Sequence, residues 1–381
     1  MKKILKVIAW IIGVPVLLIN IYILFSGKTY LYKALAYNFV DIDDNTLFNQ
    51  RKVEASQGIE WPLKSNYNTM KAPDYLIEEL EKYKSVAYLV IQNDSILYEK
   101  YWEGYSDKSI SNSFSMAKSI IGIMTGIALD EGKIKSLDQP VADFIPEFKD
   151  GEKSKITIRH LLMMSSGLDW DEAYANPLSV TTEAYYGTDL YKIATQQKVI
   201  QEPGKEFIYQ SGNTELLGLI LENATGKSLS EYASEKLWKP LHAMNNAEWS
   251  LDKEDGREKS YCCFYSNARD FARIGALYMH SGMMFGKQIV SSDYVKTSVI
   301  PAPLTDSGSK NEVYGYHWWI TRYENHKVFY MRGILGQYVL VFPDENMIVV
   351  RLGHQRPPKT DDGELTDVPV FLKGALEMAG H

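Results

Sequence analysis

Two parts of the chain carry the hydrophobic pattern of β-strands. Apolar and β-branched residues fill the runs 86–92 and 95–102, and the turn dipeptide Asn93-Asp94 separates them, so this part predicts a β-hairpin. In the C-terminal third, further apolar runs between residues 326 and 353 alternate with Gly, Pro-Asp and Asn turns. The pattern therefore predicts strands near both ends of the main domain.

Between these strands the period changes to that of helices. Apolar residues recur three and four positions apart in the segments 115–131, 157–168, 213–241 and 269–283. Gly132 follows the first segment and is suited to end it as a C-cap. Strands at both ends with helices between them predict an α/β (α+β) fold, in which distant segments build one sheet and a mostly helical region is inserted.

The first part of the chain is apolar enough to cross a membrane. Residues 7–25 are nineteen positions without a charge, and Lys2, Lys3 and Lys6 precede them. A helix of this length spans the hydrocarbon core of a bilayer, and the basic residues favour a cytoplasmic N-terminus. The following residues offer little of a cleavage site, so the sequence predicts an uncleaved membrane anchor at 1–27. A cleaved signal peptide is the alternative.

After the anchor at 1–27, the sequence predicts a connector and a main domain. Residues 28–70 mix aromatic, Asn and Asp residues without a clear period, which predicts an irregular connector packed on the main domain. Residues 71–381 form that domain. With the N-terminus in the cytoplasm, we expect the domain to work outside the cytoplasmic membrane, in the periplasm or the extracellular space.

Composition and charge argue against several classes of protein. Hydrophobic residues make up 45% of the chain and charged residues 23%, as in ordinary globular proteins. The net charge of −7 and the lack of a basic block argue against nucleic-acid binding. Cys262 and Cys263 are adjacent, which predicts no disulfide because neighbouring cysteines rarely meet its geometry. Cys/His pairs at ligand spacing are lacking, so we expect neither a metal site nor a cofactor.

A serine and a lysine three positions apart open the helical segment 115–131. On a helix, Lys118 lies about one turn from Ser115 on the same face, and a serine hydroxyl needs such a base to become a nucleophile. The helix N-terminus adds N–H donors where negative charge would develop. The same pattern occurs at 250–253 and 307–310, but no apolar helix follows there. Ser115 is therefore the candidate nucleophile, and an ordinary N-cap serine is the alternative.

Six Tyr-x-Asn/Ser patterns supply candidates for a tyrosine beside this pair. Tyr209 follows a Pro-Gly turn and a short apolar stretch and leads into a helix, a context that presents a side chain at the edge of a cleft. Tyr265 is the runner-up, in a segment typical of a helix start. Further along, the glycines that begin at Gly333 allow a close approach of the backbone to a substrate, with N–H groups free to bind an oxyanion.

Six segments together resemble those of the serine β-lactamase-like hydrolases, and they occur in the same order. They are the pattern at 115–118 and the segments 157–172, 203–218, 268–282, 314–320 and 332–351. This family includes class C β-lactamases, DD-peptidases, related esterases and 6-aminohexanoate-oligomer (nylon-oligomer) hydrolases. The resemblance covers the chain from about residue 70 to the C-terminus. It implies a β-lactamase/transpeptidase-like fold, with a central antiparallel sheet flanked by helices.

The resemblance also implies roles for individual residues. Ser115 would be the acylated nucleophile of a serine hydrolase, and Lys118 and Tyr209 would share the general-base and general-acid work. The backbone N–H groups of Ser115 and Ile334 would form the oxyanion hole. Tyr174 matches a loop tyrosine that contacts substrate in the nylon-oligomer hydrolases. Two further candidates for substrate binding are Asn213 and Gly333.

Two departures from the β-lactamase pattern bear on the substrate. Gln210 and Ser211 follow Tyr209 where β-lactamases have Tyr-x-Asn, and residues 331–333 read Met-Arg-Gly where they have Lys-Thr-Gly. That lysine helps to bind the carboxylate of β-lactams, so its loss favours small carboxylic esters or linear amides as substrates. A β-lactamase or DD-peptidase acting on cell-wall-related substrates is one alternative, and a catalytically silent peptide-binding protein is another.

Overall fold

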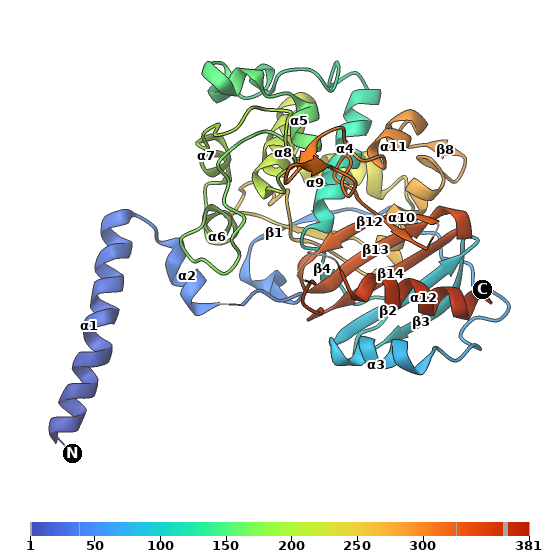
Figure 1. Ribbon diagram of the computed structural model, residues 1–381, viewed down its shortest axis with the longest axis horizontal. Coiled ribbons are helices and arrows are strands. Elements are labelled where there is room, and N and C mark those ends of the chain that lie inside the picture. The colour runs from blue at the N-terminus through green and yellow to red at the C-terminus, as the bar shows by residue number, and fades with distance from the viewer. Residues whose placement is uncertain (1, 38, 325, 361–364, 381) are drawn as a thin grey trace.

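A six-stranded antiparallel sheet stands at the centre of the computed structural model, which describes residues 2–37, 39–324, 326–360 and 365–380 (Figure 1). In spatial order its strands are β11 (Trp319–Tyr323), β12 (His326–Gly333), β13 (Gln337–Phe342), β14 (Met347–Gly353), β2 (Ser85–Gln92) and β3 (Ser95–Tyr101). β14 pairs with β2, so the C-terminal strands join the hairpin from early in the chain. The predicted α/β (α+β) fold and its shared sheet are confirmed.

Helices cover both faces of this sheet. They are α3 (Asp74–Lys82) and α12 (Asp367–Ala379) on one face and α4 (Met116–Asp130) and α10 (Ala268–Met279) on the other. Side chains alternate along β2 accordingly. Tyr88 and Val90 belong to the apolar cluster beneath α3 and α12, and Leu89 and Ile91 belong to the cluster beneath α4 and α10. Every residue of β2 is buried, which explains why its sequence is continuously apolar.

A mostly helical region adjoins the sheet (Figure 1). Its helices are α5 (Ile158–Leu162), α6 (Val180–Tyr186), α7 (Leu190–Thr195), α8 (Ser211–Thr225), α9 (Leu229–Ala233) and α11 (Ser292–Ser298). The predicted helical segment 213–241 is divided into α8 and α9. α8 ends where Gly226 adopts a left-handed φ of 69°, and Ser228 caps α9 with its side chain. α8 packs against α4 and α5, so the start of α8 lies beside the start of the Ser115 helix.

A second, smaller sheet and several two-residue strands complete the domain. The sheet has the order β1 (Gln50–Val53), β5 (Ala247–Ser250), β6 (Phe264–Ser266) and β4 (Ser111–Asn112). The short pairs are β7 (Met283–Met284) with β8 (Lys287–Gln288), and β9 (Thr305–Asp306) with β10 (Ser309–Lys310). The connector at 28–70 is thus more regular than the sequence predicts, because it supplies β1 and the helix α2 (Tyr30–Ala36).

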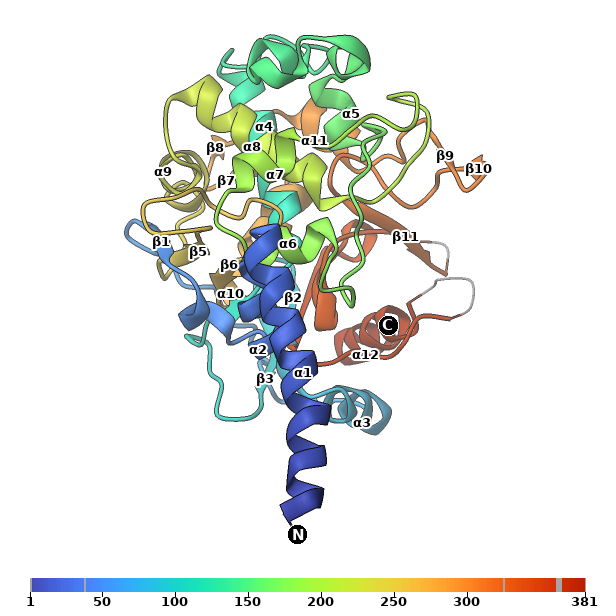
Figure 2. The same ribbon diagram turned by 90° about the vertical axis from the view of Figure 1, so that its left-hand side faces the viewer.

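The N-terminal helix α1 (Lys2–Ser26) projects away from the main domain (Figures 1 and 2). Trp10, Leu24 and Phe25 on this helix are exposed. Within the part of the chain that the structure describes, no helix is long and apolar enough to cross a membrane. The structure thus gives no support to the membrane anchor predicted at 1–27.

Candidate active site

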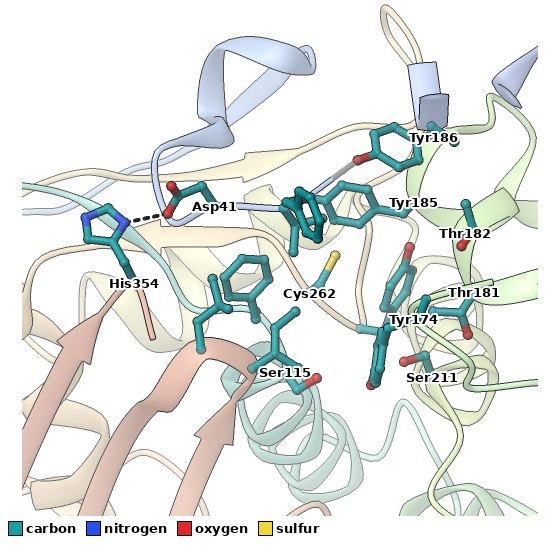
Figure 3. Close-up of a pocket in the computed structure, with 18 of the residues that line it drawn as sticks. Asp41, Ser115, Tyr174, Thr181, Thr182, Tyr185, Tyr186, Ser211, Cys262 and His354 are labelled. Carbon is teal, nitrogen blue, oxygen red and sulfur yellow. Dashed lines mark hydrogen bonds and ion pairs between the residues drawn. The ribbon is translucent and has the colours of Figure 1, made fainter. Parts of the chain in front are cut away.

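A cavity of about 880 Å³ opens where α4 begins (Figure 3). Its wall combines Ser115 with Tyr174 from the loop before α6, Thr181 from α6 itself, Cys262 from the turn before β6, and Ile334 after β12. Segments far apart in the sequence therefore meet around one serine. The connector also contributes through residues 39–41, since Asp41 lies 2.5 Å from Nδ1 of His354 at the rim.

The serine–lysine pair is in contact at the bottom of this cavity. Ser115 stands at the N-cap position of α4, yet its side chain makes no capping hydrogen bond. Instead its Oγ lies 3.0 Å from Nζ of Lys118, one helical turn along. The N-cap alternative therefore does not describe this serine, and the contact is the one that a nucleophile and its base require.

Lys118 is buried and held by three oxygen atoms. Besides Ser115 Oγ, its Nζ lies 3.0 Å from Ser211 Oγ and 3.0 Å from the carbonyl oxygen of Tyr261. Burial lowers the pKa of Lys118 to about 8, although the carboxylates of Glu172 and Glu215 oppose this shift. Lys118 therefore loses its proton more readily than a free lysine, and the neutral amine is the form that accepts a proton.

Tyr209 joins this pair. Its ring lies 5.1 Å from Lys118 Nζ, and it packs against the ring of Trp319 at 5.3 Å. Burial, reinforced by the Glu172 charge, raises the pKa of Tyr209, while a hydrogen bond with Ser115 opposes the shift. Tyr265 lies elsewhere, in β6, where its hydroxyl accepts a hydrogen bond from Asn112 at 3.0 Å. Of the two candidate tyrosines, the structure brings Tyr209 to the serine.

The loop after β12 brings Ile334 to the cavity. A Cβ atom on Gly333 would lie 2.3 Å from the carbonyl oxygen of Ser113, so only glycine allows β12 to end this close to the start of α4. Ile334 follows directly and lines the cavity together with Ser115. This placement suits the predicted oxyanion hole of two backbone N–H groups.

Two further predicted features lie away from the cavity wall. Asn213 is fully buried in α8, and its side-chain amide donates to Met164 Sδ at 3.5 Å. Met331, at the position of the β-lactamase lysine, is fully buried in the core, and the Arg332 guanidinium lies 4.8 Å from the centre of the Trp319 ring. Among the described residues, the cavity lining includes neither Asn213 nor Gly333. Gly333 instead allows the end of β12 to approach Ser113.

A carboxylate that the sequence analysis missed lies beside the serine–lysine pair. Glu172 accepts hydrogen bonds from the backbone N–H of Ser211 at 2.7 Å, from the Ser211 hydroxyl at 2.6 Å and from the Tyr174 hydroxyl at 2.6 Å. Ser211 occupies the third position of the Tyr-x-Asn/Ser pattern that begins at Tyr209, and its hydroxyl makes the contact with Lys118. The proximity of Glu172 to Tyr174 in the sequence was the available signal.

The prediction about the cysteines is wrong. Cys262 and Cys263 form a disulfide, with an S–S distance of 2.05 Å. Cys263 adopts a φ of 64°, in the left-handed region that non-glycine residues rarely occupy, and this local backbone brings the two adjacent side chains together. Cys262 lines the cavity one residue after the carbonyl that holds Lys118.

A metal ion needs several His, Cys, Asp or Glu side chains gathered at one place. Across the described ranges, no group of three or more His, Cys, Asp or Glu residues has the arrangement to bind a metal ion. The buried imidazole of His317 instead contacts the Thr214 hydroxyl and the Leu162 carbonyl oxygen, and burial lowers its pKa to about 3. The polar groups next to Ser115 are the Lys118 amine and the hydroxyls of Ser211 and Tyr209, and the Glu172 carboxylate follows one hydrogen bond beyond Ser211.

Comparisons with known proteins bear on the family of this chain. The beta-lactamase family model matches residues 74–369. The 6-aminohexanoate-dimer hydrolase of Paenarthrobacter ureafaciens is 29% identical over 308 residues, covering 76% of this chain and 77% of that protein. Protein flp of Staphylococcus aureus (strain COL) is 31% identical over 166 residues, covering 40% of this chain and 32% of that protein.

Solved structures share the fold. A provisionally assigned 6-aminohexanoate-dimer hydrolase from Bacillus anthracis superposes with a TM-score of 0.78 at 24% identity, covering 89% of this chain and 92% of that one. A family VIII carboxylesterase superposes with a TM-score of 0.65 at 16% identity, covering 84% and 99%. At these identities the similarity shows the fold alone, and it confirms the β-lactamase/transpeptidase-like architecture.

Proposed function

Since this chain belongs to the β-lactamase family of hydrolases, we propose that it is a serine hydrolase that cleaves small carboxylic esters and linear amides through an acyl-enzyme. The observation that carries the proposal is the 3.0 Å contact between Lys118 Nζ and Ser115 Oγ at the bottom of an open cavity. A nucleophile and a base in hydrogen-bond contact are the minimum that covalent acyl transfer needs.

Acylation uses the buried lysine as the first base. Neutral Lys118 takes the proton of Ser115 while Oγ bonds to the substrate carbonyl carbon. The carbonyl oxygen becomes negative and accepts hydrogen bonds from the backbone N–H groups of Ser115 and Ile334. The bond to the leaving alcohol or amine then breaks, and Tyr209, whose raised pKa keeps it protonated, donates a proton to the leaving group and regains one from Lys118.

Deacylation repeats these steps with water. A water molecule attacks the acyl carbon of the Ser115 ester and passes its proton to the Lys118–Tyr209 pair. The ester bond to Oγ breaks, Ser115 recovers its proton, and the carboxylic acid leaves. The products are one acid and one alcohol or amine, with no other reactant consumed.

The substrate class rests on three residues, Met331 and Arg332 in β12 and Tyr174 at the cavity wall. β12 has Met331 in place of the lysine that binds a β-lactam carboxylate. Met331 is buried and Arg332 stacks on Trp319, so neither side chain takes over that role. Tyr174 is 52% exposed at the cavity, and we propose that its hydroxyl turns from Glu172 to donate its proton to a leaving amine. The relative from Paenarthrobacter ureafaciens, named for hydrolysis of a linear amide dimer, supports the same class.

Three substrates test this proposal. Values of kcat/KM for a p-nitrophenyl short-chain ester, a linear amide and nitrocefin should rank the ester above nitrocefin in the wild-type protein. Tyr174→Phe should impair the amide more than the ester, because an amine leaving group needs a proton that nitrophenolate does not. A wild-type preference for nitrocefin would instead identify a β-lactamase, and no turnover of any of the three would favour the binding protein.

A second part of the proposal concerns location. The uncharged segment 7–25 and the lysines before it support attachment to a membrane, with the main domain outside the cytoplasm. Deleting residues 1–27 should move the protein from the membrane fraction to the soluble fraction and retain ester hydrolysis, since the connector residues 39–41 that line the cavity remain. Recovery of the full-length protein in the soluble fraction would contradict this part.

A further inference from the structure

We propose that Glu172 is a positioning residue that, through Ser211, directs the reactive lone pair of Lys118 at Ser115. This inference rests on the proposed function and deepens it. Glu172 lies in the loop between α5 and α6, and both of its carboxylate oxygens are engaged at the start of α8. Glu172 forms no hydrogen bond with Ser115 or Lys118, so its hydrogen bonds reach the reaction only through Ser211.

The hydrogen bonds around Ser211 have a defined direction. As a carboxylate, Glu172 only accepts, so the single hydroxyl hydrogen of Ser211 points at Glu172 Oε1, 2.6 Å away. The Ser211 oxygen therefore presents only lone pairs to Lys118, whose Nζ lies 3.0 Å from it. Ser211 accepts a hydrogen bond from Lys118 and cannot donate one back.

The same reasoning fixes the amine. The carbonyl oxygen of Tyr261, 3.0 Å from Nζ, also only accepts. Neutral Lys118 has two N–H bonds and one lone pair, and Ser211 and Tyr261 use both N–H bonds. The third direction of the nitrogen meets Ser115 Oγ, so the lone pair faces the proton that it must remove.

Loss of the Glu172 charge undoes this orientation. In Glu172→Gln the side-chain amide can donate to Ser211 Oγ, so the Ser211 hydroxyl hydrogen is free to turn towards Lys118. It then competes with Ser115 for the lone pair. Substrate binding does not involve this hydrogen bond, so the effect should fall on kcat rather than on KM.

The charge also has a second, separable effect. Glu172 attracts the ammonium form of Lys118 and so raises its pKa against the lowering by burial. Removing that charge should move the acid limb of the pH–rate profile to lower pH. The other titratable and charged groups around this network are Glu215, Tyr174, Tyr209, Tyr261, Tyr314, His317 and Arg332. None of them changes in the variants below.

A purely structural role for Glu172 makes different predictions. The carboxylate binds the Tyr174 hydroxyl and the first backbone N–H of α8, so it also anchors a loop to a helix. Loosening that anchor would change KM or the thermal midpoint. It would not shift the pH limb, and its effect would not depend on the Ser211 hydroxyl.

A double-mutant cycle distinguishes these roles. We would measure kcat, KM and the pH profile of p-nitrophenyl ester hydrolysis in the full-length protein, in Glu172→Gln, in Ser211→Ala and in the double variant, with circular dichroism as a check of folding. Glu172→Gln should lower kcat by about 10²-fold with KM unchanged, as expected for a misdirected base. Because Glu172 acts through Ser211, the double variant should be no slower than Ser211→Ala. Glu172→Asp should restore part of the rate.

A matched control and an independent readout keep the outcomes distinct. Glu183→Gln makes the same chemical change on α6, where the carboxylate pairs with Lys28 at 3.8 Å, and should leave kcat and the pH limb unchanged. The rate of fluorophosphonate labelling of Ser115 reports on activation without a chosen substrate. A wild type that is neither labelled nor active would overturn both proposals. A labelled wild type matched in rate by Glu172→Gln, or multiplicative losses in the cycle, would overturn the role of Glu172 alone.

Discussion

Gly333 and Ser113 approach so closely that a Cβ atom on Gly333 would lie 2.3 Å from the carbonyl oxygen of Ser113. The contact joins the end of β12 to the residues that lead into α4, and it sets the distance between the two backbone N–H groups assigned to the oxyanion hole. In the proposed mechanism, the strand end at Gly333 thus positions the Ile334 N–H group beside Ser115.

Substitution of this glycine should therefore impair chemistry. Gly333→Ala forces the strand end away from Ser113 and displaces the Ile334 N–H, and loss of one oxyanion donor typically lowers kcat by about 10²–10³-fold. Steady-state kinetics with a p-nitrophenyl ester measures this, with the thermal midpoint as a check of folding. A folded variant with unchanged kcat would show that Ile334 has no part in the reaction.

The tyrosine assignment makes a paired prediction. Tyr209→Phe removes the proton donor beside Ser115 and should lower kcat by about 10²–10⁴-fold, the usual contribution of a general acid or base. Tyr265→Phe is the matched control, because its hydroxyl contacts Asn112 instead. The reverse order of the two effects would move the middle motif from Tyr209 to Tyr265.

The pH dependence follows from the buried lysine. Burial lowers the pKa of Lys118 to about 8, and only the deprotonated amine accepts the Ser115 proton. The value of kcat/KM should therefore rise with pH through about 8 and level off above it. Lys118→Arg, which stays charged, should be inactive throughout. A wild-type profile that is flat between pH 6 and pH 9, or that falls, would exclude Lys118 as the base.

Features that depend on neighbouring residues were predictable from the sequence, and contacts between distant segments were not. β12 and β14 fall within the strands predicted between residues 326 and 353, because they are apolar runs bounded by turn residues, and the Ser115–Lys118 spacing is local to one helix. Glu172 and the Tyr261 carbonyl were out of reach, because their contacts join residues 39 and 143 positions apart. Spacing along the chain cannot report which loops fold onto one helix N-terminus.

The disulfide shows the same limit and yields a prediction. Reduction of Cys262–Cys263 frees the turn that carries the Tyr261 carbonyl, so the hold on Lys118 should loosen and kcat should fall. Phosphine treatment, with intact mass to show the gain of two hydrogens, measures this against a Cys262→Ser/Cys263→Ser variant, which should not respond. Full activity of the reduced wild-type protein would mean that the turn holds its shape without the bond.

The central claim is that Ser115 is the nucleophile that becomes acylated, and one measurement addresses it directly. The full-length protein is treated with a fluorophosphonate probe, its intact mass is recorded, and the modified peptide is sequenced. We predict a single adduct on Ser115, absent from Ser115→Ala, and loss of ester hydrolysis in that variant with little change in folding, since the half-buried Ser115 side chain makes no capping hydrogen bond. An adduct on another residue, or ester hydrolysis retained by Ser115→Ala, would contradict the account.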